Sequence, residues 1–269
     1  MHTLICFREF PYAEPTVYFG GLVAGLISSS TTLLRVIDNE DQTDQAKISL
    51  VEAQSLLQGL EVTKKIRIGN PLKEIFEEAS EGEYDIVVVG SQEVLRLLDS
   101  LFDTFTDKVA NKATSNVLVV RGEKKELNQI LIPIGGQKMS RPVVELGSKI
   151  AKAAGAKVTL LYVTSPIPTM YTGMDGMEET LSELLETDTP ISRHLHWSAQ
   201  YLDEQGVKAE LKLQQGVASD EIMREAHVGD YDLIVIGARI ELGPFRKILV
   251  DQVTPRVIER SPCPVLVVR

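Results

Sequence analysis

Two stretches of sequence decide the fold of this chain: Tyr84-Asp85-Ile86-Val87-Val88-Val89-Gly90 and, 147 residues later, Tyr231-Asp232-Leu233-Ile234-Val235-Ile236-Gly237. In each stretch a tyrosine and an aspartate precede an apolar run that ends at a glycine. Gly69 and Gly216 are separated by the same 147 residues. Landmarks at constant spacing indicate a unit duplicated in tandem.

A third landmark lies near the end of each copy. Val117-Leu118-Val119-Val120-Arg121 returns 148 residues later as Val265-Leu266-Val267-Val268-Arg269, so the second copy has gained one residue before this segment. Residues 121–126 form a short charged linker. We therefore predict one domain over residues 1–123 and a second over residues 127–269.

Both copies alternate predicted strands with predicted helices. In the first copy we predict strands at residues 3–7, 32–37, 62–68, 86–89 and 117–120, and helices at 15–26, 46–57, 72–79 and 106–113. In the second we predict strands at 129–134, 157–163, 208–214, 233–237 and 265–268, and helices at 140–155, 180–205, 218–226 and 255–259.

Continuous Val, Ile and Leu strands separated by helices are typical of a parallel sheet covered on both faces. The predicted fold class is therefore α/β, with two doubly wound, Rossmann-like parallel-sheet domains in tandem. The apolar segment at residues 17–27 has about 11 residues, whereas a membrane-spanning helix needs about 20. We interpret it as a buried helix.

Composition excludes several classes of function. The net charge is −10, and acids exceed bases in both halves, 20 to 13 in residues 1–126 and 18 to 15 in residues 127–269. A basic face for nucleic acid or anionic lipid is not expected. The two cysteines, Cys6 and Cys263, are expected to be reduced and packed, and no secretory leader is apparent, so we expect a cytoplasmic protein.

Several segments resemble the universal stress protein family. Residues 129–134 are similar to its opening strand, residues 231–239 to its fourth strand and turn, and Arg260-Ser261-Pro262-Cys263-Pro264 with residues 265–268 to its closing strand. The resemblance implies an adenine nucleotide α-hydrolase-like fold and an intramolecular pseudo-dimer in which the two closing strands meet. A homodimer and an unknown protein partner are further expectations.

The ATP-binding branch of that family has a loop of the form G-x2-G-x9-G-[ST], and an Asp that ends the first strand. Glycines there let the backbone approach phosphates, and a helix N-terminus offers N–H donors. In the first copy Gly90 is retained, but Glu93 and Asp103-Thr104 occupy the later positions, and Arg8 replaces the Asp. A carboxylate about 4 Å from a phosphate charge costs about 4 kcal/mol at an effective dielectric near 20. We expect Arg8 and Asp103 to face one crevice and to pair there.

The second copy departs in the same way. Gly237 is retained, Ile240 replaces the second glycine, and Asp251-Gln252 takes the Gly-Ser place; Gly135 stands where the first-strand Asp belongs. The resemblance implies binding positions at Gly237, Arg239, Gly243, Gln252, Gly135 and Val163 in the second copy, and at Gly90, Thr104 and Arg8 in the first.

The leading functional hypothesis is a non-catalytic stress-response protein that acts through protein contacts or regulation. The alternative is an ATP- or adenine-nucleotide-binding switch with a rearranged phosphate loop, and the third is an enzyme of the wider nucleotide hydrolase group. We predict no bound cofactor; ATP and ADP are the ligands that the alternative hypothesis would require. We predict no metal site, because His194 and His196 are two residues apart and do not share a helix face.

Two other segments carry interpretations of their own. The acidic run Glu74, Glu77, Glu78, Glu81 and Glu83 is expected to be the solvent-exposed face of a helix and its exit. Residues 164–179 contain three methionines. They form either a solvent-exposed loop or a lid or partner surface built from adaptable side chains.

Overall fold

The computed structural model describes residues 1–91, 115–135, 140–165, 180–238 and 253–269. The chain forms two compact units. Unit 1 comprises residues 1–126 together with 262–269, and unit 2 comprises residues 127–261. Among the described residues, no helix combines the length and apolar character that a membrane crossing requires.

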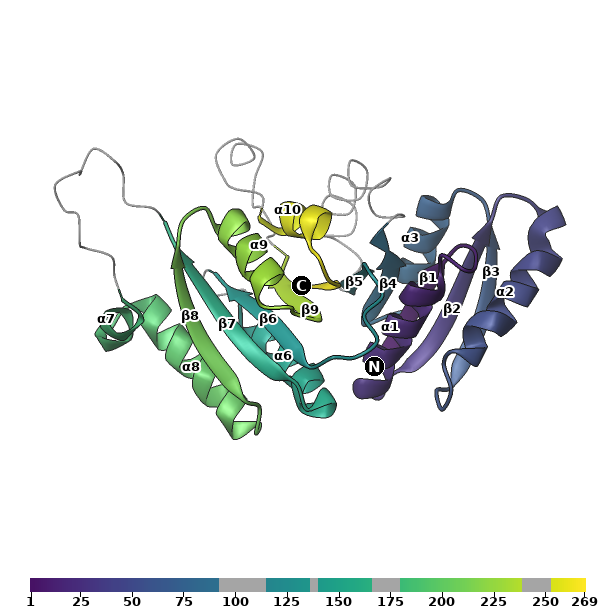
Figure 1. Cartoon of the computed structure of the whole chain (residues 1–269). Helices are drawn as coiled ribbons and strands as arrows, with labels where there is room; N and C mark the ends of the chain where they lie inside the picture. Colours follow the sequence, from purple (N-terminus) through teal and green to yellow (C-terminus); the bar gives the residue numbers. More distant parts are fainter. Residues whose placement is uncertain (92–114, 136–139, 166–179, 239–252) are drawn as a thin grey trace. The chain divides into compact units, whose positions relative to one another are not determined.

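Unit 1 is built on a sheet with the strand order β3-β2-β1-β4-β5-β10. The first five strands in this order run parallel to one another. Helices α1 and α2 lie on one face and α3 on the other (Figure 1). Its elements are β1 (His2–Phe7), α1 (Glu14–Leu26), β2 (Ser30–Ile37), the 3-10 turn η1 (Glu40–Gln42), α2 (Thr43–Ser55), β3 (Val62–Ile68), α3 (Pro71–Glu81), β4 (Ile86–Gly90), β5 (Asn116–Val120) and β10 (Val265–Val268).

The closing strands of the two repeats pair with each other within unit 1. Strand β10 runs antiparallel to β5, with Val265 opposite Val119 and Val267 opposite Val117. The main-chain N–H of Arg269 donates to the side-chain oxygen of Asn116 at 3.1 Å. The expectation that these strands meet is confirmed.

Unit 2 repeats the design with the parallel strand order β9-β6-β7-β8. Helices α6 and α8 contact each other on one face, and α9 and α10 contact each other on the opposite face (Figure 1). Its elements are β6 (Gln129–Ile134), α6 (Ser140–Ala154), β7 (Lys157–Thr164), α7 (Leu181–Glu186), α8 (Pro190–Glu204), β8 (Ala209–Gln215), α9 (Ala218–Val228), β9 (Leu233–Gly237) and α10 (Val253–Arg260).

The buried cores lie where the apolar runs predict. Strand β4 is buried along its whole length, and so are the first four residues of β9. Both strands receive side chains on both faces, which explains why their sequences are continuously apolar rather than alternating. The α/β fold class predicted from these runs is confirmed.

The paired glycines explain part of the repeat. Gly69 has φ = 144° and Gly216 has φ = 155°, conformations that residues with a Cβ rarely adopt. A Cβ on Gly69 would lie 2.9 Å from a carboxylate oxygen of Glu74, and one on Gly216 would lie 2.7 Å from that of Glu221. Glycine is therefore required twice, at the same turn into a helix.

The prediction of a single helix over residues 180–205 is wrong. The structure has two helices, α7 and α8, with a break before Pro190. Pro190 has no N–H to donate and occupies the first turn of α8. The hydroxyl of Thr189 accepts from the N–H of Ser192 at 3.2 Å and begins the new helix. The predicted helix at 106–113 lies outside the described residues.

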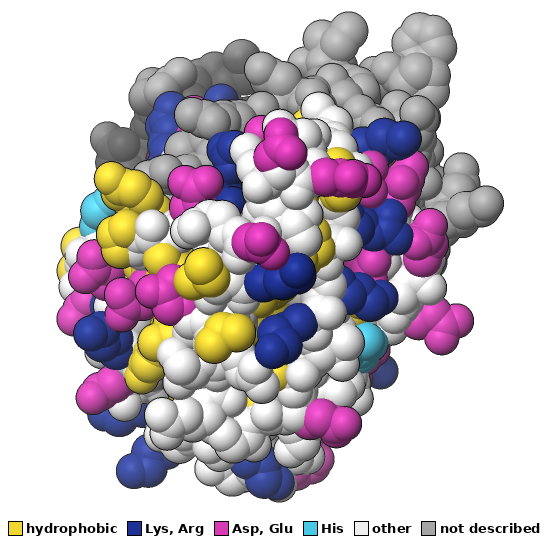
Figure 2. Space-filling view, turned by 90° about the vertical axis from the view of Figure 1, so that its right-hand side faces the viewer, with side chains coloured by type: hydrophobic (Ala, Val, Ile, Leu, Met, Phe, Trp, Pro, Cys, Tyr) yellow, Lys and Arg dark blue, Asp and Glu magenta, His cyan; other side chains and the backbone are white. Residues whose placement is uncertain are grey.

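One edge of unit 1 is formed by β3, with α2 beside it. Figure 2 looks onto this edge and shows hydrophobic side chains interspersed with basic and acidic ones. The exposed aliphatic residues include Ile48 and Val51 on α2 and Ile68 on β3. Lysines at positions 64 and 65 of the same strand are also exposed. Charged residues on an edge strand disfavour pairing with another sheet.

Candidate functional site

The candidate site is a crevice in unit 1 at the carboxyl ends of its parallel strands. After β1 the chain builds β2 and β3 on one side, and it then builds β4 and β5 on the other. In open α/β sheets ligands bind at such a switch point. A cavity of about 910 Å³ lies here, lined by Arg8 after β1, Val36 in β2, Gly90 in β4 and Val120 in β5.

Three of the five basic side chains that line this crevice are buried more deeply than the acidic ones, and the other two, Arg8 and Lys125, are exposed. The basic lining residues are Arg8, Arg35, Arg121, Lys124 and Lys125, and the acidic ones are Glu9, Glu14, Asp38 and Glu123. All four acids are exposed, whereas Arg35 is buried and Arg121 and Lys124 are half-buried. Among the described residues that line the crevice, the charged side chains that are buried or half-buried are therefore all positive.

Arg35 is the most deeply buried of these cations. Its side chain is 8% exposed. One terminal nitrogen, Nη1, donates to the carbonyl of Val36 at 2.8 Å, and Nη2 contacts the carboxylate of Glu9 at 3.4 Å. The Nε atom has no hydrogen-bond partner among the described residues. Burial lowers the pKa of Arg35, the Glu9 carboxylate opposes this, and nearby Arg8 lowers the pKa further.

Helix α1 and the linker form two other walls of the crevice. The first residues of α1 line it, and no side chain caps the helix N-terminus at Ala13. The hydroxyl of Tyr18 donates to the carbonyl of Lys125 at 3.3 Å, which holds the linker against α1. Tyr12 also lines the crevice and is 82% exposed. Aromatic faces and the first turn of α1 thus border the same space as the cations, while the N–H groups of Ala13 and Glu14 donate to the carbonyls of Glu9 and Pro11.

The structure places the first-copy candidates as follows. Arg8 and Gly90 both line the crevice, as expected. Thr104 lies outside the described residues, and so does Asp103, so the proposed Arg8–Asp103 pair stays a prediction. Sequence reasoning missed Arg35. Its signal was a single charge inside the apolar strand Leu33-Leu34-Arg35-Val36-Ile37.

In unit 2 the structure brings three candidates to neighbouring strand ends. Gly135 follows β6, Val163 lies near the end of β7, and Gly237 ends β9. The carbonyl of Gly237 accepts from the hydroxyl of Thr254 at 3.0 Å, which ties β9 to α10. Arg239, Gly243 and Gln252 lie outside the described residues, as do Asp251 and residues 166–179 of the methionine-rich segment.

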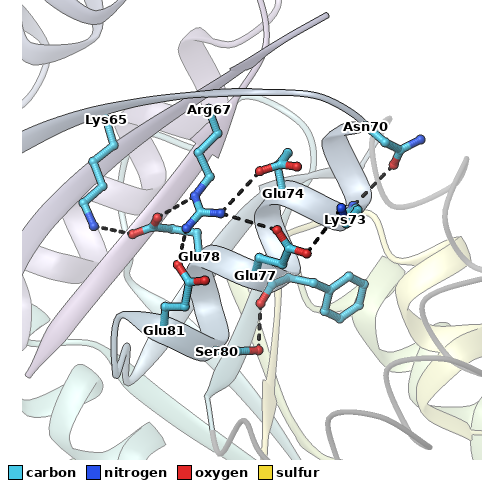
Figure 3. Close-up of polar contacts among 10 residues, drawn as sticks. Lys65, Arg67, Asn70, Lys73, Glu74, Glu77, Glu78, Ser80 and Glu81 are labelled. Atoms are coloured by element: carbon cyan, nitrogen blue, oxygen red, sulfur yellow. Dashed lines mark hydrogen bonds and ion pairs between the residues drawn. The ribbon is translucent and has the colours of Figure 1, made fainter.

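A second cluster of charged residues lies between β3 and α3 (Figure 3). Arg67 contacts four glutamates of α3: Glu74 at 3.3 Å, Glu77 at 3.7 Å, Glu78 at 2.8 Å, and Glu81. The expectation that this acidic run is a solvent-exposed face is wrong for Glu78, which is 3% exposed. Its burial is possible because three donors satisfy its carboxylate.

Those donors set the ionisation of Glu78. Lys65 Nζ lies 2.5 Å from Oε1, the hydroxyl of Tyr84 donates to the same oxygen at 2.6 Å, and Arg67 Nε donates to Oε2 at 2.8 Å. Burial by itself would raise the pKa of Glu78, but these three hydrogen bonds outweigh it and lower the pKa. The ionised form is therefore the one that the fold stabilises.

The second repeat contains the Lys–Glu–Tyr part of this arrangement 147 residues later, with Gln214 in the place of Arg67. Glu225 is 8% exposed and accepts from Lys212 at 2.8 Å and from the hydroxyl of Tyr231 at 2.7 Å. Burial, together with the Glu225 carboxylate, raises the pKa of Tyr231 to about 12. A charge cluster that recurs in both repeats with every partner satisfied has a structural role.

Within the described ranges no group of three or more His, Cys, Asp or Glu residues is placed to hold a metal ion.

The chain is similar in sequence to known proteins along both halves. The model of the universal stress protein family matches residues 25–121 and 126–269. A universal stress protein of Methanocaldococcus jannaschii is 32% identical over 151 residues, which are 56% of this chain and 87% of the relative. Universal stress protein YxiE of Bacillus subtilis is 26% identical over 147 residues, which are 53% of this chain and 99% of the relative.

Similarity to a solved structure extends over the whole length. A universal stress protein from Archaeoglobus fulgidus DSM 4304 matches 100% of this chain and 98% of its own, with a TM-score of 0.69 and 13% sequence identity. At that identity the likeness shows the fold alone. Because the family model matches most of both halves, the chain belongs to the universal stress protein family and contains two copies of its domain in tandem.

Proposed function

We propose that this chain is a non-catalytic regulatory protein, in which the crevice of unit 1 binds a small molecule and the bound state changes the contacts made with other proteins. The observation that carries the proposal is the crevice itself. Its volume of about 910 Å³ is at the upper end of ligand pockets, and it lies where α/β sheets bind ligands. A buried guanidinium in its wall favours a ligand with negative charge.

The chemistry of the lining supports binding rather than turnover. Among the described residues that line the crevice there is no histidine and no cysteine. Ser91 follows β4 and lines the crevice, but a serine needs an adjacent base to act as a nucleophile. The described lining thus supplies charge and aromatic surface for binding, without a nucleophile and its base.

The second candidate is an adenine-nucleotide switch. Gly90 is retained at the end of β4 and lines the crevice. Tyr12 and Tyr18 offer ring faces on which a base can stack. This candidate differs from the first in requiring that adenine nucleotides, rather than other anions, occupy the crevice.

A thermal-shift screen with a parallel turnover assay tests both. Ligand at 100 times its dissociation constant stabilises the native state by about 2.7 kcal/mol. The full chain is heated with ATP, ADP or AMP and magnesium, and phosphate release is measured on the same samples. A rise of a few degrees without turnover supports a non-catalytic receptor, and turnover above a no-protein blank contradicts it. A rise specific to ATP or ADP favours the switch.

A further inference from the structure

We propose that the crevice of unit 1 binds a phosphate monoester with its dianionic group against Arg35 and Arg8, at the carboxyl ends of β1 and β2. This inference rests on the proposed function, because it specifies the ligand of the same crevice. It assigns the phosphate to the ends of β1 and β2, whereas the family resemblance implies phosphate binding at the loop after β4, the strand on the other side of β1.

The first argument is the unbalanced charge on Arg35. A buried cation is costly unless hydrogen bonds and an opposite charge compensate it. Glu9, the carboxylate that contacts it, is 72% exposed and lies 3.4 Å away, and Nε has no partner among the described residues. Arg8 adds a second positive charge close enough to lower the pKa of Arg35, which burial lowers most and the carboxylates of Glu9 and Asp38 raise. Two arginines held together in this way are stabilised by a dianion.

The second argument is the geometry of the surrounding donors. Guanidinium groups bind phosphate through two parallel hydrogen bonds, which a compact dianion can accept from both arginines. Helix α1 has 13 residues, and its first turn lines the same end of the crevice, with no side chain capping Ala13. The positive end of the helix dipole adds to the field of the arginines, and the exposed carboxylate of Glu14 in the first turn opposes it.

The third argument concerns the position of these groups in the repeat. Arg8 directly follows β1, and Arg35 lies within β2. Gly90 and Ser91 lie at the end of β4. In the second repeat, Gly135 directly follows β6, at the position that corresponds to Arg8 after β1 in the first repeat. Tyr162, one residue before Val163 in β7, occupies the place of Arg35 before Val36 in β2. The arginine pair is thus specific to unit 1, and so is the predicted phosphate position.

The test compares AMP with adenosine, which differ only in the phosphate, by isothermal titration calorimetry on the full chain. We expect AMP to bind at least about tenfold more tightly than adenosine, since a charge-assisted hydrogen bond contributes about that factor or more. Arg35→Met keeps an unbranched side chain as far as the position of Nε and removes the charged guanidinium group. Arg8→Gln changes an exposed residue and is expected to fold normally.

Each variant should weaken AMP about tenfold or more and leave adenosine unchanged. Arg193→Gln, an exposed arginine of unit 2 that pairs with Asp188, is the control of equal charge change and should bind AMP like the wild type. Equal affinity for AMP and adenosine, no measurable AMP binding, or unchanged AMP affinity in Arg8→Gln would overturn the proposal. Turnover of ATP would contradict the proposed function alone, since it does not bear on where the phosphate lies.

Discussion

Removing the charge of Glu78 should destabilise unit 1 strongly, although the residue belongs to an acidic run that looks solvent-exposed in sequence. In Glu78→Gln the side chain keeps its size but offers one oxygen and one NH2 group. Lys65 and Tyr84 both contact Oε1, and Arg67 contacts Oε2. Whichever way the amide turns, its NH2 group faces at least one donor.

The magnitude follows from the burial of the carboxylate and the exposure of its partners. Removing one member of a buried ion pair typically costs about 3–5 kcal/mol. Lys65 is 44% exposed and can turn toward solvent, which reduces the cost. We therefore expect Glu78→Gln to lower the free energy of unfolding by about 2–4 kcal/mol.

Urea unfolding followed by far-UV circular dichroism measures this change. The matched control is Glu77→Gln on the same helix. Glu77 is 43% exposed and contacts Arg67 at 3.7 Å and Lys73 at 3.6 Å. An exposed pair of this kind contributes at most about 1 kcal/mol. If both variants lost the same free energy of unfolding, or if Glu78→Gln lost less than about 0.5 kcal/mol, the reasoning would be refuted. The buried ion pairs would then stabilise the fold no more than the exposed ones do.

The second repeat and the pH dependence supply three more expectations. The pKa of Glu225 is lower in the folded state than in the unfolded state. Its ionised carboxylate therefore stabilises the fold above the unfolded-state pKa, and this stabilisation is lost as the pH falls through the folded-state pKa. The stability of Glu225→Gln should therefore fall less steeply with decreasing pH than that of the wild type. The pKa of Tyr231 is raised to about 12, so its neutral form contributes stability below about pH 10 that is lost toward pH 12. The pKa of Tyr84 is raised as well, so ultraviolet titration should show late-titrating tyrosines, and Tyr231→Phe should remove one of them. Asp232→Ala should cost about 2–3 kcal/mol in urea unfolding, since Asp232 accepts from the N–H groups of Asn128 and Gln129 at 2.8 and 3.0 Å, whereas Asp232→Asn should keep most of the stability.

The sequence predicts the secondary structure well where backbone conformation and burial leave a local pattern. The apolar run Ile86–Gly90 predicts a buried parallel strand, and the structure buries all of it. Gly69 and Gly216 mark the same turn because residues with a Cβ rarely adopt their positive φ angles. Thr189 followed by Pro190 is also a local pattern typical of a helix start. It is easily missed because the residues on both sides fit one continuous helical pattern.

The parts that sequence reasoning missed depend on contacts between distant residues. Glu78 is buried because Lys65 and Arg67 reach it from β3, and helical periodicity alone does not show those partners. Arg35 lines the crevice because the end of β1 lies beside its strand and the end of β4 lies beside β1, which follows from the order of strands in the sheet. For Arg35 the available signal was a single charge inside an apolar strand, whereas Glu78 stands in an acidic run that gives no such signal.

The position of a bound phosphate is the most direct test of the central claim that buried and exposed arginines make the crevice an anion receptor. A crystal structure of the full chain with AMP would show it. We predict phosphate oxygens about 2.7–3.1 Å from the guanidinium nitrogens of Arg35 or Arg8. A phosphate bound instead beyond the end of β4, beside Gly90 and Ser91 and away from both arginines, would contradict the account.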